Sequence, residues 1–222
     1  MRRFFTWVFL CVFVPLLASA QDYSKVEVFG GYSYLHIDTH GVTTSSLTQQ
    51  CNILAGGTCP LTFHINPNFQ GWEVSAQYNF NQWLGVKADV SGHYGKLVTA
   101  SFPGFPLGPL SISPSEHIYD FVFGPVLSYR SDRYTAFAHT LLGAEHVGSN
   151  LTPTAPVPIS VPPPYFSETD FAWIIGGGLD IRLTRHISIR AGQFDYQFVN
   201  SSGGHQNDLR LSTGVVVGLG RK

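Results

Sequence analysis

Apolar and polar residues alternate in short segments that recur along most of the chain. The clearest segment is 72–80, in which every second side chain from Trp72 to Phe80 is apolar and those between are polar or charged. A strand turns successive side chains to opposite faces, so a period of two gives one apolar and one polar face. The pattern therefore predicts β-strands that lie between an apolar and a polar environment.

Eight segments are predicted as strands on this pattern: 25–37, 72–80, 84–93, 116–130, 134–147, 171–183, 186–198 and 208–219. Three connections between them are short and predict hairpin turns, at 81–82, 131–133 and 184–185. The others are long, at 38–68, about 97–115, 148–168 and 199–207. Short and long connections alternate, so we expect all the long ones at one end of the sheet.

The segment 186–198 changes phase part of the way along. Ile187 and Ile189 share one face, whereas Phe194 and Tyr196 fall on the opposite parity. One extra residue in a strand restores such a pattern, because a β-bulge sets two residues against one on the neighbouring strand. We therefore predict a bulge near Gly192-Gln193.

The first twenty residues have the order of a secretory signal peptide. Arg2 and Arg3 precede an apolar run over 4–17, and Ala18-Ser19-Ala20 forms a small-residue cleavage site. The run is too short for a spanning helix. We expect residues 1–20 to be removed, with Cys11 among them, and residues 21–222 to form one domain.

No later stretch reaches 18 consecutive apolar residues, so the sequence predicts no spanning helix in the mature chain. Charged residues make up 12% of the chain and aromatic residues 14%, which suits a surface facing lipid. Strands that cross a bilayer must close into a barrel, because backbone groups in hydrocarbon need partners. The predicted fold is all-β: an eight-stranded antiparallel up-and-down β-barrel in an outer membrane, with short turns in the periplasm.

A soluble eight-stranded barrel with an apolar interior shows the same periodicity and is the main alternative. The low charge, the long loops at one end and aromatic residues near predicted strand ends favour the membrane barrel, since such residues form interfacial girdles. These aromatic residues are Trp72, Phe80, Trp83, Tyr119, Tyr129, Tyr134 and Trp173.

In the membrane barrel, the polar faces enclose ionised side chains of both signs. They are Glu73, Lys87, Asp89, Asp120, Asp180, Arg182, Arg190 and Arg210. Enclosed charges must pair or meet water. We expect one ion pair between Asp180 and Arg190, and another between Glu73 and Lys87, which lie within one diagonal step in the predicted hairpin. Side chains about fill a barrel of this size, so no wide pore is expected.

The long loops carry proline and the two remaining cysteines. Segments 101–110 and 153–165 are rich in proline and predict extended, irregular chain. Cys51 and Cys59 lie in the longest loop, and an oxidising compartment favours a disulfide between them. A metal site there would need more ligands than the nearby His64.

Residues 190–196 (RAGQFDY) and 207–217 (NDLRLSTGVVV) resemble the outer-membrane β-barrel family typified by the transmembrane domain of OmpA. The resemblance implies an anchoring barrel and says little about activity. The last strand is similar to the signal read by the barrel-assembly machinery, carried by Thr213, Gly214, Val217 and Leu219. It implies that machinery and periplasmic chaperones as partners.

Three motifs suggest chemistry. His186 and Ser188 resemble the His-x-Ser pair of barrel lipid A deacylases, with Asp195 as the next acid, but His186 falls at a periplasmic turn. His36, Asp38 and His40 alternate and could hold a metal ion, but such spacing is common and a solvated strand end is the favoured explanation. Gly176-Gly177-Gly178 lacks the setting of a phosphate loop and is typical of close backbone packing. We expect no enzyme, metal or cofactor.

The predicted function is a structural or surface-interaction role, exerted through long outer loops. The alternatives are a narrow channel for ions or small solutes, an outer-membrane lipid hydrolase using Ser188, and a soluble periplasmic ligand-binding barrel. Outer-membrane lipids are expected partners and the chain is expected to be a monomer. Without Arg2 and Arg3, 11 basic residues face 14 acidic ones, so nucleic acid is not an expected partner.

Overall fold

The computed structural model describes residues 23–39, 42–104, 110–153, 165–201 and 204–221. The predicted signal peptide and Cys11 lie outside these residues, as do His40 and much of the proline-rich segments. Among the described residues, no helix is long and apolar enough to cross a membrane.

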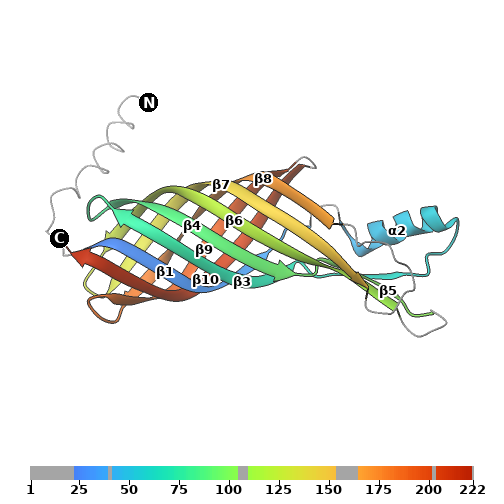
Figure 1. Ribbon diagram of the computed structural model, residues 1–222, viewed down its shortest axis with the longest axis horizontal. Helices are drawn as coiled ribbons and strands as arrows, with labels where there is room; N and C mark the ends of the chain where they lie inside the picture. The colour runs from blue at the N-terminus through green and yellow to red at the C-terminus, as the bar shows by residue number, and fades with distance from the viewer. Residues whose placement is uncertain (1–22, 40–41, 105–109, 154–164, 202–203, 222) are drawn as a thin grey trace, which may run out of the picture.

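Eight long antiparallel strands close into a barrel (Figure 1). They are β1 (Ser24–His36), β3 (Asn68–Asn79), β4 (Leu84–Gly95), β6 (Leu110–Arg130), β7 (Tyr134–Pro153), β8 (Tyr165–Arg182), β9 (Ile187–Ser201) and β10 (Gly204–Arg221). Each pairs with the next of these along the chain, and β1 pairs with β10 to close the ring. The predicted eight-stranded up-and-down barrel is confirmed.

Apolar side chains cover the outside of the barrel and polar ones lie within it. On β3, Trp72, Val74 and Tyr78 are 39%, 47% and 40% exposed, whereas Glu73 and Ser75 between them are buried. Large hydrophobic side chains are exposed in the same alternating way on every strand of the barrel. A soluble barrel requires the opposite arrangement, so the soluble alternative is wrong.

The phase change in β9 is a bulge at the predicted place. Arg190 lies opposite Gly214 on β10 and Gln193 lies opposite Ser212, so β9 has one residue more than its partner here. Ala191 and Gly192 both face outward as a result. The bulge sends Arg190 and Gln193 into the lumen although they are three positions apart.

Glycine allows the backbones to approach closely where the ring closes. Gly31 on β1 lies opposite Gly214 on β10. A β-carbon at Gly31 would overlap the carbonyl oxygen of Thr213. The glycines at 176–178 serve a similar purpose, since a β-carbon at Gly176 would overlap the Asp195 carboxylate, which agrees with the predicted close packing.

At one end of the barrel the strands continue well past the length that a membrane requires. β6 and β7 have 21 and 20 residues, whereas about 9–11 suffice to span a bilayer. β5 (Val98–Phe102) pairs with the start of β6, and β2 (Thr62–Ile65) pairs with β5. Figure 1 shows this extension, with α2 (Thr44–Ala55) beside it, at the end opposite the last residues of β10.

The prediction of loop connections over 38–68 and 97–115 is wrong for much of both segments, because they contain α2, β2, β5 and the start of β6. Pro114 lies inside β6, opposite Leu151 of β7, in the short gap between the residues that pair with β5 and those that pair with β4. A missing amide proton is tolerated there because neither neighbour on that side forms a ladder at this residue. Cross-strand pairing that the local composition does not reveal decides the structure of this part of the chain.

The close approach at Gly31 leads to a stability prediction. Gly31→Val should lower the free energy of unfolding by about 1–3 kcal/mol, because the side chain must displace the β10 backbone. Urea unfolding in lipid vesicles, followed by the gel mobility of unboiled samples, measures this. Gly30→Val is the matched control, since a β-carbon there meets no atom within 4 Å. An equal loss in both variants would contradict the packing described.

Candidate functional site

The middle of the lumen contains a network of ionised side chains centred on Arg210 of β10. Its guanidinium is fully buried and lies 2.7 Å from Asp195 Oδ2 and 3.2 Å from Asp89 Oδ1. It also donates to Ser91 Oγ at 3.0 Å. Buried cations are tolerated when paired and hydrogen-bonded in this way.

Lys87 connects a second part of the network. Its Nζ lies 2.8 Å from Asp89 Oδ2 and 3.4 Å from Glu73 Oε1. The register pairs Glu73 with Ser91, so Lys87 lies two same-face positions away and not the expected single step. The pairing still forms because the long lysine side chain reaches along the lumen.

Asp180 and Arg190 form the ion pair expected from their positions across the β8–β9 hairpin. Arg190 Nε and Nη2 lie 2.8 and 3.1 Å from the two carboxylate oxygens of Asp180. The guanidinium carbon also lies 4.1 Å from the ring centre of Phe29 and 4.3 Å from that of Phe137. Such a two-pronged pair, held between two aromatic rings, fills the lumen toward the end with short turns.

Sequence analysis missed several members of the network. His139 Nε2 lies 2.9 Å from Asp195, and Gln197 Nε2 donates at 2.7 Å to both Asp120 and Glu145. The signal was present, since Asp195 and Gln197 alternate with the outward Phe194 and Tyr196 of β9. Inward parity predicts a place in the lumen for amide and histidine side chains as well as for charged ones.

Apolar side chains close the lumen toward the long-strand end. One buried cluster comprises Leu35, Ile37, Phe69 and Ile118, with Leu97 and Val147 against it. A second comprises Val122, Leu141, Ala172 and Ile174 and lies beside the charged network, with Val122 opposite Asp89 and Ile174 opposite Gln197 in the strand register. Together with the ion pairs, these clusters fill the barrel as expected for eight strands.

Arg182 departs from its predicted place in the network. It lies at the short-turn end of β8, only half-buried, and donates to the backbone carbonyl of Asp132 at 3.4 Å. It lines an open cavity together with His186 and Ser188. Asp195, the third residue of the suggested hydrolase, is held in the lumen by Arg210 and His139. The structure therefore does not assemble the three residues.

The residues that suggested a metal site are also dispersed. His36 Nδ1 lies 2.9 Å from Asn68 Oδ1, and the backbone amide of Asp38 donates to Asp208. Among the residues that the structure describes, no group of three or more His, Cys, Asp or Glu side chains is arranged to hold a metal ion. A solvated strand end accounts for His36 and Asp38.

Beyond the barrel, helix α2 is fixed at both ends by its own sequence. Thr43 is the N-cap and exchanges hydrogen bonds with Ser46, from Ser46 N to Thr43 Oγ1 at 3.1 Å and from Thr43 N to Ser46 Oγ at 3.0 Å. Gly56 ends the helix in the left-handed conformation, with φ at 65°. These capping interactions stabilise a helix that has little packing to support it.

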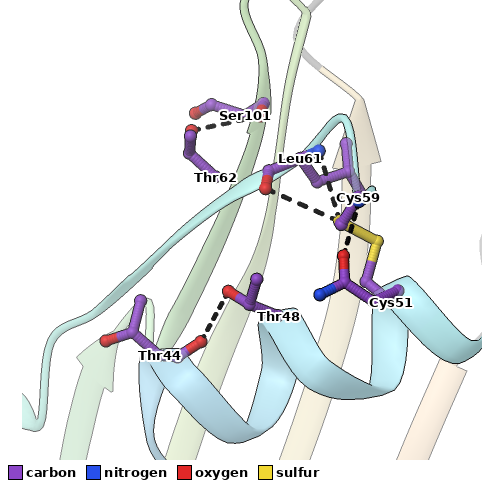
Figure 2. The surroundings of a disulfide bond; sticks show 8 residues. Thr44, Thr48, Cys51, Cys59, Leu61, Thr62 and Ser101 are labelled. Carbon is purple, nitrogen blue, oxygen red and sulfur yellow. Dashed lines mark hydrogen bonds between the residues drawn. A yellow bond between two sulfur atoms is a disulfide. The ribbon is translucent and has the colours of Figure 1, made fainter. Parts of the chain in front are cut away.

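A disulfide joins Cys51, on the last turns of α2, to Cys59 in the chain that returns toward β2 (Figure 2). The two α-carbons lie 5.4 Å apart. Asn52 Oδ1 accepts a hydrogen bond from the amide of Cys59 at 2.5 Å, and Thr62 Oγ1 donates to the Ser101 carbonyl at 3.2 Å. The loop is thus tied to itself and to the strand extension.

Helix α2 buries none of its side chains. Ile53 and Leu54, adjacent on the helix, are 72% and 88% exposed. A helix that is ordered but not covered presents its side chains to the surroundings. We name α2 together with the paired strands β2 and β5 the α2 platform.

The comparisons with known proteins bear on the barrel as a whole. A family model described as an outer membrane protein beta-barrel domain matches residues 6–222. The chain belongs to this family. It is therefore an outer-membrane β-barrel, and the predicted resemblance is confirmed. Barrels of this kind place short turns in the periplasm and long loops outside, so the α2 platform is extracellular.

Two solved structures are similar to this outer-membrane β-barrel. One is Ail, the attachment invasion locus protein of Yersinia pestis, in complex with the heparin analogue sucrose octasulfate. Its sequence is 15% identical and its TM-score is 0.52, and the match covers 87% of this chain and 99% of that chain. The other is Neisserial surface protein A (NspA), 11% identical with a TM-score of 0.51, covering 90% and 99%. These likenesses show the fold. The search of curated proteins found no match.

The buried network leads to a second stability prediction. Arg210→Met should lower the free energy of unfolding by about 3–5 kcal/mol, because it leaves Asp195 buried without the guanidinium and Asp89 with Lys87 alone. Urea unfolding in lipid vesicles measures the change. Arg133→Met, at an exposed turn position, is the control and should alter stability by no more than about 0.5 kcal/mol. Similar values for the two variants would show that the network does not matter to the fold.

The filled lumen leads to a prediction about conductance. The purified protein, reconstituted into planar bilayers, should give no reproducible single-channel steps, because ion pairs and apolar clusters occupy the path. Steps that recur over many insertions, and that change in size in Asp180→Asn, would instead support the narrow channel.

Proposed function

We propose that this outer-membrane β-barrel is a surface-interaction protein, in which the filled barrel anchors the chain and the α2 platform contacts other molecules. One observation carries the proposal: an ordered, capped and disulfide-bonded helix stands uncovered on strands far longer than the membrane requires. An ordered helix that buries no side chain adds little to the stability of the barrel itself.

The proposal includes the path by which the chain reaches the membrane. Residues 1–20 are removed as a signal peptide, periplasmic chaperones carry the mature chain, and the barrel-assembly machinery reads the last strand. Thr213, Val217 and Leu219 face outward on β10, where another protein can contact them, and Gly214 lies at the β1–β10 seam. The mature protein is a monomer surrounded by outer-membrane lipids.

The proposal assigns no enzymatic activity to the chain. The dispersal of His186, Ser188 and Asp195 between two environments supports this, as does the engagement of Asp195 by Arg210. The names of the similar proteins point to roles at the cell surface, one as an attachment and invasion locus protein and one as a surface protein. We extend that class of role to this chain.

Charge narrows the class of extracellular partner. The four long connections, at 38–68, 97–115, 148–168 and 199–207, contain neither lysine nor arginine. Sulfated or phosphorylated polymers bind through such residues. Ail was solved with a heparin analogue, whereas this chain suits an uncharged partner with an apolar contact for Ile53 and Leu54.

Whole-cell binding tests the proposal. Gram-negative cells producing the chain are applied to immobilised proteins, neutral glycans, sulfated glycans and a lawn of the same cells. Binding above that of cells without the chain is expected on at least one uncharged surface, and the double variant Ile53→Ser, Leu54→Ser should lose most of it. Thr44→Ser, Thr48→Ser is the matched control on the same helix and should bind as the parent does.

Two results would refute the proposal. One is the absence of chain-dependent binding to every surface while surface labelling shows the protein present. The other is full binding by the Ile53, Leu54 variant. Heat-modifiable gel mobility of each variant establishes that the barrel has folded.

A further inference from the structure

The periplasmic mouth of the barrel contains a polar cavity of about 340 Å³, which the anchoring role does not use. Its walls come from strands β1, β6, β7, β8, β9 and β10 and from the turn at 183–186. We propose that this cavity, named the periplasmic vestibule, binds a small oxyanion, with Arg182 as the principal contact through its guanidinium. The ligand's chemical class is a carboxylate or phosphate.

The charged side chains in the inner part of the vestibule already have partners within the protein. Asp180 at its floor is held by both prongs of Arg190, which closes the way into the lumen. Arg130 donates to Glu27 Oε1 at 3.0 Å and to the Gln82 carbonyl at 2.5 Å. These charges already have partners, so they shape the cavity without attracting a ligand.

The outer part carries hydrogen-bond donors that are not committed. Among the described residues, the guanidinium of Arg182 makes one hydrogen bond, a long one of 3.4 Å to the Asp132 backbone carbonyl. Within the part of the chain that the structure describes, the side chains of Arg185 and His186 have no hydrogen-bond or ion-pair partner, although both line the cavity. Asp132 also lines the cavity, and its carboxylate has no partner among the described residues, so Arg182, Arg185 and His186 face one spare carboxylate. A pocket in which uncommitted donors outnumber the uncommitted carboxylate selects an acceptor with negative charge.

The geometry of the guanidinium defines the ligand further. Its planar fork matches the two oxygens of a carboxylate or phosphate, and such bonds are stronger than neutral ones. Hydroxyl groups of Ser24, Thr135 and Ser188 also line the vestibule and can donate to a further oxygen. A cavity of this volume lies at the lower end of the range for small-molecule sites, so the ligand is small.

The distribution of charge along the molecule favours anions at this end. Lys25, Arg130, Arg133, Arg182 and Arg185 lie at the periplasmic end and outnumber the acidic Glu27, Asp132 and Asp180 there, whereas the four long extracellular connections contain neither lysine nor arginine. An excess of one sign raises the local concentration of the opposite ion. The vestibule therefore faces the periplasm as the electropositive end of the barrel.

Calorimetric titration of the full mature chain in nanodiscs of zwitterionic lipid tests the proposal. The probes are inorganic phosphate and succinate, with uncharged succinamide as the isosteric control. Phosphate or succinate should bind and succinamide should not. Arg182→Gln should raise the dissociation constant at least about tenfold, because it removes the charge and the fork. Arg182→Lys, which keeps the charge alone, should fall between the two.

Arg133→Gln is the matched control, since Arg133 lies on a neighbouring turn but does not line the vestibule. It should change binding less than about twofold. The proposal fails if neither anion binds at about 10 mM, if succinamide binds as well as succinate, or if the Arg182 and Arg133 variants lose binding equally. Heat-modifiable mobility shows that each variant is folded.

A second arm identifies the source of the anion. The titration is repeated in nanodiscs that contain anionic phospholipid. If the soluble probes then bind less tightly, lipid headgroups occupy the vestibule. If their affinity is unchanged, the ligand is a free periplasmic anion. Neither result bears on the extracellular proposal, because α2 lies at the opposite end of the barrel.

Discussion

The requirement that every backbone polar group in hydrocarbon has a partner governs the rest of this structure. Strands can meet it only by closing into a ring, which the antiparallel pairing of β1 with β10 completes here, and Gly31 lies opposite Gly214 where these two backbones approach closely. Closure also fixes which face of each strand is enclosed. Because the outer face meets lipid, the ionised side chains of the membrane-spanning strands lie in the lumen.

Enclosure then decides what the lumen can do. The charges in it are costly unless each finds a counter-charge or a hydrogen bond, and Arg210 and Lys87 do this by contacting carboxylates from several strands. Apolar clusters fill the space beside these charges and toward the extracellular end. A barrel filled in this way is an anchor, and its capacity for recognition lies at its two ends. The extracellular end carries the uncovered helix α2, and the periplasmic end carries uncommitted arginine side chains.

The sequence allowed much of the barrel to be predicted, because strand parity is a local property. The bulge at Ala191-Gly192 followed from a change of phase within β9, and the Asp180–Arg190 pair followed from the tight turn between β8 and β9. The two cysteines lie together in the structure as their compartment suggested. In each case the residues that mattered were close in sequence or tied by a short turn.

What could not be predicted depends on contacts between distant segments. The extension of β6 and β7 through Pro114 relies on pairing that the composition of either segment conceals. Helix α2 carries a weak apolar pattern and forms through its caps and its disulfide, so a search for amphipathic periodicity misses it. Arg182 lies at the rim because β8 ends there. Alternation along the strand predicts which face a residue occupies, but not how far along the barrel it lies.

The central claim is that the apolar face of each strand meets lipid while the ionised face is enclosed. Spin labels placed singly along β3 test it most directly, through collisions with oxygen, which partitions into lipid, and with a water-soluble nickel chelate. Labels at Val74, Ala76 and Tyr78 should collide with oxygen far more often than those at Ser75 and Gln77. Oxygen collisions greatest at 75 and 77, with nickel reaching 74, 76 and 78, would contradict the account.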